Sequence, residues 1–365
     1  MIGLLHHLSD PRRAASAGFT QFLEQCGADG PIVVFSHFDA DGLAAAAILI
    51  RALHAGGREA VPLVIGKGET PWDGTVGARI AALNPAGLIA ADLGTRAEPI
   101  VAGLPTLIVD HHCPTGIPAG AITLSGNGLE PEPTSALIAW WAAAAVGDVS
   151  HLQWLAALGL IGDMADEAAF PELAEAQARW GKTALRDATS LVNAPRRTAA
   201  ADPSPALRLL LAADGPKAIT KGDDADAHAL ADAKAEVRQA VEAAKRVAPR
   251  VAGDVAVILF HSPCQIHPLI AQRWRGRLKD KVVIAANSGY RPGWVHFAAR
   301  SATGRDLIAF LAEHRPDGAD SRYGNGHGQA TGGALPVDLW NRFIADLGLP
   351  DQRIINPNEQ GDAQG

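Results

Sequence analysis

The sequence has few cysteines and no long hydrophobic run. Only three of its 365 residues are cysteine, at Cys26, Cys113 and Cys264, far apart and odd in number. This excludes a disulfide framework and favours a reducing compartment. No apolar stretch reaches the ~20 residues of a membrane span, and residues 1–10 lack the basic start and cleavage site of a secretory signal. We therefore expect a cytoplasmic protein with no membrane partner.

Positive charge is also in short supply. The chain has 32 lysines and arginines against 39 acidic residues, a formal net charge of −7. Proteins that hold long nucleic acids through many phosphates usually have a basic surface. The charge balance therefore predicts a short or small ligand, or anions held through metal ions.

The first half of the chain alternates short β-branched runs with alanine-rich stretches, which is typical of a parallel sheet with helical crossovers. At ~150 residues per domain, the length predicts two domains. The predicted strands are residues 32–35, 61–65, 87–91 and 106–109, each apolar enough to be buried on both faces. Helices are predicted at 43–53, 133–146 and 151–164. Residues 165–205 contain four prolines and are predicted to be irregular.

The second half begins with a long predicted helix, residues 225–248, and continues as a second α/β pattern. Its predicted strands are 255–260, 282–286 and 295–299, its helices 268–278, 306–314 and 337–347, with a glycine-rich loop before the last helix. The expected fold class is α/β: a parallel-sheet N-terminal domain, a helical linker and a smaller α/β C-terminal domain, with the active site in the cleft. The expected borders are 1–200, 201–250, 251–347 and a polar tail at 348–365.

Acidic residues follow three of the predicted strands at the point where each strand ends. Asp39 and Asp41 come after the first strand, Asp92 follows the third, and Asp110 stands with His111 and His112 after the fourth. One such cluster would be an ordinary turn or helix cap. In a parallel sheet the carboxyl ends of the strands lie at one edge, and ligands bind in the crevice outside that edge. We therefore expect the three acidic clusters to come together there.

Asp163 adds a further acid, in the apolar run from Leu158 to Gly162. We expect this run to be a helix interior, where a carboxylate needs a partner. Carboxylate and imidazole ligands together favour manganese, with magnesium or cobalt as alternatives. The acids are too many for one ion. Two ions ~3.5–4 Å apart, bridged by a carboxylate, form the arrangement used for phosphoryl hydrolysis.

These motifs, taken together, resemble a known family. His37-x-Asp39-x-Asp41-Gly42, Asp92 and Asp110-His111-His112 are similar to successive motifs of the DHH phosphoesterases, and Leu158-Gly159-x-x-Gly162-Asp163 resembles the fourth. Arg300-Ser301 and the glycine-histidine segment 324–333 resemble the domain that accompanies DHH domains. The resemblance covers residues 30 to 340 and implies the two-domain fold described above.

The resemblance also implies roles for individual residues. Two divalent ions, most simply manganese, would be held by His37, Asp39, Asp41, Asp92, His111 and Asp163, with Asp92 as the bridge. A bound hydroxide would attack phosphorus. His112 would contact the scissile phosphoryl group, and Asp110 would orient neighbouring groups. The other end of the substrate would be bound by Arg300, Ser301, Gly326, His327 and Gly328.

One departure from the family pattern concerns the first motif. Many members have its histidine four residues before the first aspartate, where this chain has Phe35, and His37 is only two residues before Asp39. His37 could be a metal ligand from a shifted position, a substrate contact or a turn residue, and the sequence leaves all three open.

The first and fourth motifs are closer to those of RecJ-type single-strand exonucleases than to those of nucleotide phosphatases. We therefore expect a manganese-dependent phosphoesterase that acts on short or single-stranded oligonucleotides. The alternatives are a small-nucleotide phosphatase or cyclic-dinucleotide phosphodiesterase, and, in another class, a catalytically silent nucleotide-binding regulatory protein. The oligomeric state stays open, with a homodimer as one option.

Overall fold

The computed structural model describes residues 10–163, 165, 169–320 and 322–355, apart from the side chains of Asn325 and His327. By internal contacts, the chain divides into two compact units. The first consists of Met1–Arg196 and Ala200–Lys234, and the second of Arg197–Ala199 and Ala235–Gly365. We call them the first and second domains. None of the helices within the described ranges is both long and apolar enough to cross a membrane.

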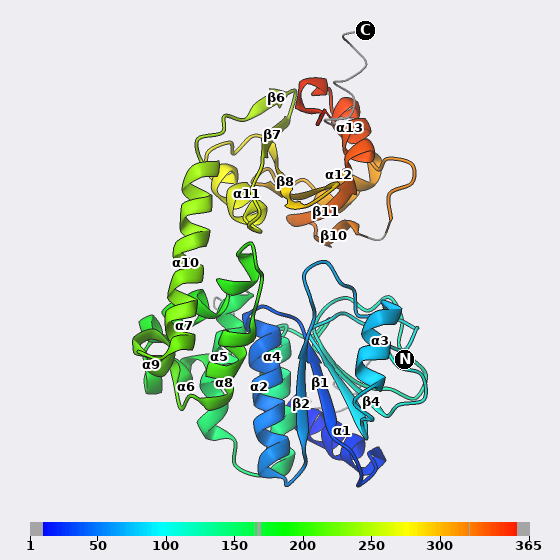
Figure 1. Cartoon of the computed structure of the whole chain (residues 1–365), viewed down its shortest axis with the longest axis vertical. Coiled ribbons are helices and arrows are strands. Elements are labelled where there is room, and N and C mark those ends of the chain that lie inside the picture. The colour runs from blue at the N-terminus through cyan, green and yellow to red at the C-terminus, as the bar shows by residue number, and fades with distance from the viewer. Residues whose placement is uncertain (1–9, 164, 166–168, 321, 356–365) are drawn as a thin grey trace. The chain divides into compact units, whose positions relative to one another are not determined.

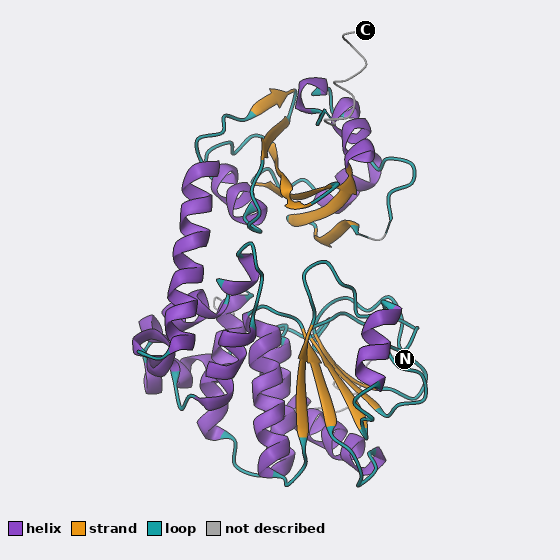
Figure 2. Ribbon diagram, in the orientation of Figure 1, coloured by secondary structure: helices purple, strands orange, loops and turns teal. Residues whose placement is uncertain are grey.

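The first domain is built on a five-stranded parallel sheet with the strand order β2-β1-β3-β4-β5. The strands are β1 (Ile32–Ser36), β2 (Ala60–Val64), β3 (Gly87–Ala91), β4 (Thr106–Asp110) and β5 (Ile122–Ser125). The helices α1 (Pro11–Gln25), α2 (Ala40–Ala55) and α4 (Ser135–Ala143) form the main core with one face of the sheet, and α3 (Gly74–Ala81) lies on the other (Figures 1 and 2). The parallel sheet expected from the sequence is confirmed.

Helix α2 is buried on almost every side. Its run of small side chains from Ala44 to Ala47 lets α4 and α5 (Gln153–Gly162) pack closely against it. Asp39 caps its start, accepting a hydrogen bond from the Gly42 N–H at 3.1 Å. Asp39 and Asp41 are therefore fixed at the N-terminus of α2, and α2 cannot shift without disturbing the core.

The structure corrects the prediction for residues 165–205, which contain two regular helices, α6 (Pro171–Trp180) and α7 (Lys182–Val192). Pro171 stands at the start of α6, where proline is well tolerated because its missing N–H would have no partner there. Leu185, Ala188 and Val192 bury one face of α7. Two shorter helices follow, α8 (Ser204–Ala212) and α9 (Pro216–Lys221).

Two strands of the first domain also differ from expectation. β2 is half-exposed rather than buried on both faces, because it is an edge strand and pairs only with β1. Pro62 lies within it, as the missing donor of proline permits at an edge. β5 was not predicted at all, since its four residues, Ile-Thr-Leu-Ser, give little periodicity.

The second domain has a six-stranded mixed sheet in the order β10-β11-β9-β8-β7-β6. Its strands are β6 (Arg250–Ala252), β7 (Val255–Phe260), β8 (Val282–Arg291), β9 (Trp294–Ser301), β10 (Tyr323–His327) and β11 (Ala330–Pro336). Side chains alternate along β8: Val282 and Ile284 face the core with α12 (Leu307–Glu313) and α13 (Val337–Asp346), and Val283 faces α11 (His267–Arg275). The C-terminal half of α10 (Ala225–Ala244) packs on the α11 side. The expected α/β class of this domain is confirmed.

The glycine-rich segment predicted to be a loop is instead the β10–β11 hairpin. A Cβ on Gly333 would lie 2.7 Å from the Arg322 carbonyl oxygen, and one on Gly332 would collide with that of Phe297 in β9. Those two glycines therefore serve close strand packing. A glycine-rich composition by itself could not distinguish this role from that of a loop.

Candidate metal centre

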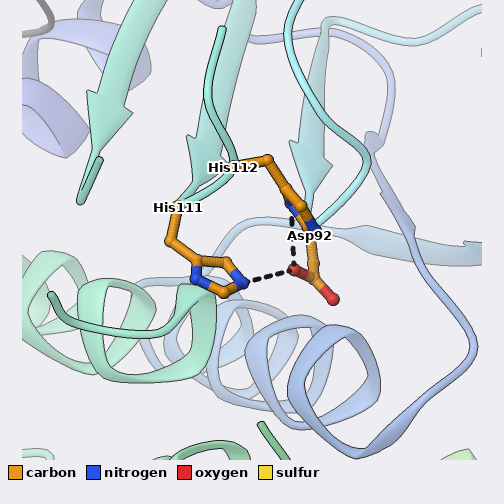
Figure 3. Close-up of side chains that lie close together, drawn as sticks. All are labelled: Asp92, His111 and His112. Atoms are coloured by element: carbon orange, nitrogen blue, oxygen red, sulfur yellow. Dashed lines mark ion pairs between the residues drawn. The ribbon is translucent and has the colours of Figure 1, made fainter. Parts of the chain in front are cut away.

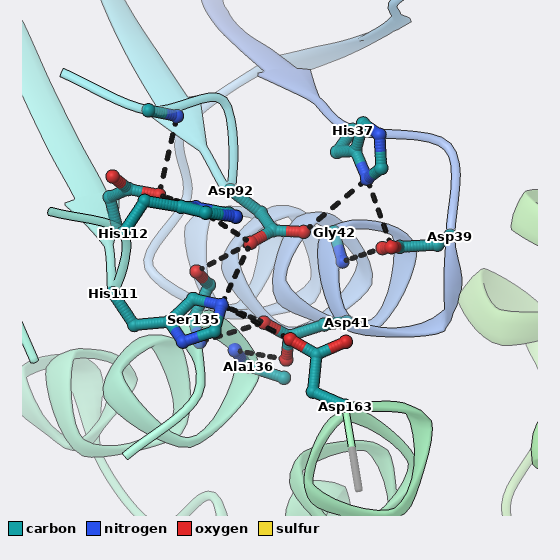
Figure 4. Close-up of polar contacts among 12 residues, drawn as sticks. His37, Asp39, Asp41, Gly42, Asp92, His111, His112, Ser135, Ala136 and Asp163 are labelled. Carbon is teal, nitrogen blue, oxygen red and sulfur yellow. Dashed lines mark hydrogen bonds and ion pairs between the residues drawn. The ribbon is translucent and has the colours of Figure 1, made fainter. Parts of the chain in front are cut away.

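The acidic clusters meet at the carboxyl ends of three adjacent strands (Figure 4). Asp39 follows β1, Asp92 follows β3 directly, and Asp110 is the last residue of β4. Parallel pairing of β1 with β3 and of β3 with β4 brings these ends to one edge of the sheet. The convergence that the sequence predicted is therefore present in the fold.

Asp92 lies at the centre of this cluster. Its carboxylate is almost fully buried and accepts a hydrogen bond from the Ser135 hydroxyl at 3.0 Å. Three imidazoles face it: His111 Nε2 at 3.5 Å, His37 Nδ1 at 3.6 Å and His112 Nδ1 at 3.8 Å. Figure 3 shows the ion pairs that join Asp92 to His111 and His112, the two histidines that follow β4. Asp92 has a φ of 62°, a left-handed conformation that aspartate tolerates better than most residues.

The side chains form three groups whose ligand atoms lie within 4.8 Å of one another. The groups are His37, Asp39 and Asp92; Asp92, His111 and His112; and Asp41, His111 and Asp163. Asp92 belongs to two groups and His111 to two. An overlapping set of carboxylates and imidazoles can hold more than one divalent cation.

Asp41 is fully buried beneath this cluster. Its two oxygens accept hydrogen bonds from the backbone N–H groups of Ser135 and Ala136, at 2.8 and 2.9 Å, at the start of α4. Burial raises the pKa of Asp41 well above its usual value, and the neighbouring Asp92 and Asp163 carboxylates raise it further. Such a crowd of acids is stable only if something positive offsets their charge.

His111 shows where that positive charge is needed. Its Nε2 is buried and faces three carboxylates, Asp163 at 3.1 Å, Asp92 at 3.5 Å and Asp41 at 3.9 Å, yet makes no well-aligned hydrogen bond with any of them. An imidazole nitrogen so close to three carboxylates forms a set of ligand atoms that suits a bound divalent cation. The residues present therefore fit a divalent metal ion.

The structure corrects the expected setting of Asp163. Helix α5 ends at Gly162, and Asp163 is the residue that caps it, with 27% of its side chain exposed, rather than a residue of the helix interior. Gly159, one helical turn before Asp163, explains how α5 comes so close to Asp41 and α4. A Cβ on Gly159 would collide with Asp41 Oδ1 and lie 2.6 Å from the Ala136 side chain.

His37 reaches the cluster despite its shifted position in the sequence. Its Nδ1 lies 3.0 Å from Asp39 Oδ2. Burial lowers the pKa of His37, but the charges and hydrogen bonds of Asp39 and Asp92 outweigh it and raise the pKa to about 10. In the metal-free protein, the protonated His37 ring therefore offsets the charge of Asp39 and Asp92, as a bound cation would.

Arg196 was not anticipated from the sequence. Its Nη1 lies 3.4 Å from Asp39 Oδ2, and its Nε is buried with no hydrogen-bond partner among the described residues. The adjacent Asn193 accepts from the Ala40 N–H at 3.0 Å. Arg196 is 157 residues from Asp39 along the chain, in a stretch predicted to be irregular, so only the packing of α7 against α5 could reveal it.

His112 and Asp110 form a pair at the rim of the cluster. His112 Nδ1 lies 2.9 Å from Asp110 Oδ1, and Asp110 also accepts from the Gly94 N–H at 3.3 Å and the Thr95 hydroxyl at 3.4 Å. Burial lowers the pKa of His112, but Asp110 outweighs it and raises the pKa to about 9. With Nδ1 held by Asp110, Nε2 of the half-exposed ring is the nitrogen left for a ligand.

The remaining predicted residues lie in the second domain. Arg300 and Ser301 end β9, where Arg300 donates to the Ala299 and Thr331 carbonyls at 2.9 and 3.2 Å. Arg275 donates to the Ser301 carbonyl at 2.8 Å. Gly326 is in β10 and Gly328 follows it; the His327 backbone is in β10 too, but its side chain lies outside the described part of the structure. Their role in substrate binding stays a prediction.

Known proteins share this architecture. No family model matches the chain, and no curated protein matches it in sequence. Among solved structures, RecJ from Thermus thermophilus in complex with Mn²⁺ is 23% identical, with a TM-score of 0.70 over 95% of this chain and 55% of that one. An exonuclease RecJ bound to manganese is 21% identical, with a TM-score of 0.64 over 95% of this chain and 97% of that one.

A third structure, the DHH domain of a member of the s1p family of ribosomal proteins, is 14% identical, with a TM-score of 0.64 over 94% of this chain and 92% of that one. The chain thus spans about half the length of the Thermus RecJ and nearly all of the other two. The chain therefore has the fold that these RecJ structures and this DHH domain share.

Proposed function

We propose that the protein is a divalent-metal phosphoesterase that hydrolyses phosphodiester bonds in short or single-stranded oligonucleotides. The observation that carries this proposal is the position of Asp92, shared by two of the three overlapping His/Asp groups. A carboxylate shared in this way suits a pair of divalent ions, and paired ions are suited to phosphoryl transfer. Manganese is the first candidate, because RecJ structures of the same fold contain it.

When bound, divalent ions would activate water and neutralise the charge of a phosphoryl group. The residues of the chain supply the rest. Asp41 and Asp92 are held by α4 through Ser135 and Ala136, so they keep their orientation. His112, positioned by Asp110, would donate from Nε2 to a phosphoryl oxygen and so stabilise charge that develops there. Arg196, next to Asp39, supplies a second donor.

The preference for short substrates rests on charge. With 39 acidic against 32 basic residues, the chain has little electrostatic attraction for a long polyanion. Local neutralisation of the cluster by metal ions would still allow a short phosphodiester to bind. In this proposal Arg300, Ser301, Gly326, His327 and Gly328 contact the part of the substrate remote from the scissile bond.

The decisive experiment is a cleavage assay in manganese with end-labelled short DNA and RNA, bis-phosphorylated adenosine and cyclic dinucleotides. We expect cleavage of short single strands and at least a thousandfold loss of kcat/KM in Asp92→Asn. Asn keeps the left-handed backbone conformation of residue 92 but removes the charge. Asp29→Asn, at an exposed position, is the matched control.

Each outcome of that assay has a clear meaning. Cleavage of monomeric nucleotides or cyclic dinucleotides without cleavage of oligomers would replace the oligonucleotide proposal with a small-nucleotide phosphoesterase. No cleavage of any substrate, together with less than one bound manganese ion per chain after dialysis against the metal, would favour a silent nucleotide-binding protein.

A further inference from the structure

The first domain contains a cavity of about 320 Å³ that the proposed chemistry does not use. Its floor is the sheet, at Ala90 of β3 and Ile108 of β4, both nearly fully buried. Their neighbours Ala91 and Val109 point to the opposite face and join the helix-covered core. Parallel sheets normally have helices over both faces. Over β3 and β4, two loops cover the second face and leave this space.

The walls of the cavity are mostly apolar. They come from two loop segments, residues 99–105 between β3 and β4 and residues 118–121 between β4 and β5. Helix α3 covers the neighbouring part of the same face by packing Val76 and Ile80 against β1 and Leu88. Protein interiors rarely leave voids larger than a water molecule, whereas pockets for small molecules begin at ~300 Å³. The cavity is therefore the size of a ligand site.

One cation lines this apolar space. The Arg96 guanidinium lies 4.2 Å from the centre of the Trp72 ring, and both residues line the cavity. The indole N–H of Trp72 donates to the Glu98 carbonyl at 3.0 Å, which fixes the ring. Arg96 forms no ion pair with any residue of the described ranges. A guanidinium that rests on an aromatic ring and has no acidic partner among the described residues can still pair with an anion.

We propose that this cavity binds a small planar organic anion, with its apolar body against Ala90 and Ile108 and its anionic group paired with Arg96. We further infer that its occupancy affects the cluster at the strand ends. Gly94 and Thr95 line the cavity and are also the residues that donate to Asp110, at 3.3 and 3.4 Å. Asp110 in turn positions His112, so a ligand that shifts residues 94–95 changes the orientation of that ring.

Anilinonaphthalene sulfonate is a suitable probe, because it combines a planar aromatic body with one anionic group and fluoresces when buried in apolar surroundings. We expect one saturable site per chain in the full-length protein. Arg96→Ala should weaken the probe about tenfold, as expected for the loss of a partly buried ion pair, and leave the affinity of the uncharged parent N-phenylnaphthylamine unchanged. Arg13→Ala, an exposed arginine on α1, is the matched control.

A second variant tests the cavity rather than the charge. Ala90→Leu places a larger side chain on the cavity floor and should weaken both the probe and its uncharged parent at least tenfold. Equal binding by the wild type, Arg96→Ala and Ala90→Leu would overturn the proposal, and so would a stoichiometry that rises without saturation. Thermal unfolding of each variant shows whether it is folded. If Ala90→Leu does not fold, the proposal is still tested by Arg96→Ala, which should weaken the charged probe and leave the uncharged parent unaffected.

The coupling has its own test. In the active enzyme, saturation with the probe should change kcat/KM at least threefold, and Thr95→Val should keep probe binding but reduce that change, because it removes one of the two contacts with Asp110. No change on saturation would overturn the coupling. This part rests on the proposed function, but the binding measurements use no activity, so a protein that cleaves nothing can still confirm or refute the cavity site.

Discussion

At the scale of single residues, the environment of Asp39 suggests a role for Arg196 in substrate binding. Within the part of the chain that the structure describes, Asp39 pairs with Nη1 of the guanidinium, and the buried Nε has no hydrogen-bond partner. We expect Arg196→Ala to lower kcat/KM at least tenfold, because a donor to the phosphate is lost. Manganese affinity should not fall, since a cation that competes for Asp39 is removed. Isothermal titration with manganese and cleavage kinetics separate the two effects.

The same arginine offers a graded control. Arg196→Lys should restore only part of the activity, because a lysine ammonium has no equivalent of Nε. Arg208→Ala removes an exposed arginine that pairs with Asp226 and should change neither quantity. A drop in manganese affinity for Arg196→Ala that matches the drop in activity would contradict a role in substrate binding.

The three cysteines should differ in reactivity. Burial raises the pKa of both the Cys26 and the Cys264 thiol to about 11, with Arg58 opposing the shift at Cys26 and Glu236 adding to it at Cys264. Cys113 is exposed. At pH 8 we expect one fast-reacting thiol per chain in the native protein and three in urea, measured with a chromogenic disulfide reagent. Two or more fast thiols in the native protein would show that the core opens readily.

At the scale of elements, the centre depends on how closely α5 approaches α2 and α4. Gly159 leaves no room for a methyl group beside Asp41 and Ala136. Gly159→Ala should therefore displace the Asp41 carboxylate or push α5 away, lowering manganese affinity at least tenfold and destabilising the domain by about 1–3 kcal/mol. Gly74→Ala, in α3, where an added Cβ would meet nothing within 4 Å, is the control for a glycine in a helix.

Gly159→Ala also tests how the acids are held. The N-terminus of α4 donates two backbone hydrogen bonds to Asp41, and its first residue, Ser135, donates a third bond to Asp92. If Gly159→Ala binds manganese like the wild type, then the contact between α5 and Asp41 is not what orients the carboxylate. In that case α4 alone would be sufficient.

At the scale of the whole molecule, stability should depend on pH and metal together. In the metal-free protein the pKa of His37 is raised to about 10 and that of His112 to about 9, by nearby acids that overcome burial. Between the ordinary histidine value of ~6.5 and these values, the folded chain binds more protons than the unfolded chain. The free energy of unfolding should therefore fall as pH rises from about 7 to about 10, measured by urea titration in a chelator.

Manganese should reverse this trend. A bound cation takes the place of the protons, so the folded chain no longer gains them, and stability with excess manganese should rise or stay level over the same pH range. His37→Gln should flatten the slope seen in the chelator. If the metal-free protein becomes more stable between pH 7 and pH 10, the acids around His37 do not hold the imidazolium as the structure indicates.

Several properties of this protein followed from its sequence alone. Short apolar runs predicted the strands β1, β3, β4 and β7, because burial of these segments is local and periodic. The acids after β1, β3 and β4 predicted a common site, because parallel topology leaves few other arrangements. The start of α1 is likewise local, because the Asp10 side chain accepts from the Arg12 N–H at 3.0 Å and Pro11 is the first helical residue.

Tertiary structure decided what depends on contacts between distant segments. The pairing of Arg196 with Asp39, the exposure of β2 as an edge strand and the capping position of Asp163 have no local signal. Glycine is the clearest case. Gly332 is needed because the Phe297 carbonyl oxygen lies where a Cβ would be, and Gly159 because the Asp41 carboxylate does. Local propensity and spacing could therefore predict that carboxylates and imidazoles form the metal centre. The packing of helices and strands decided which groups hold those side chains in place.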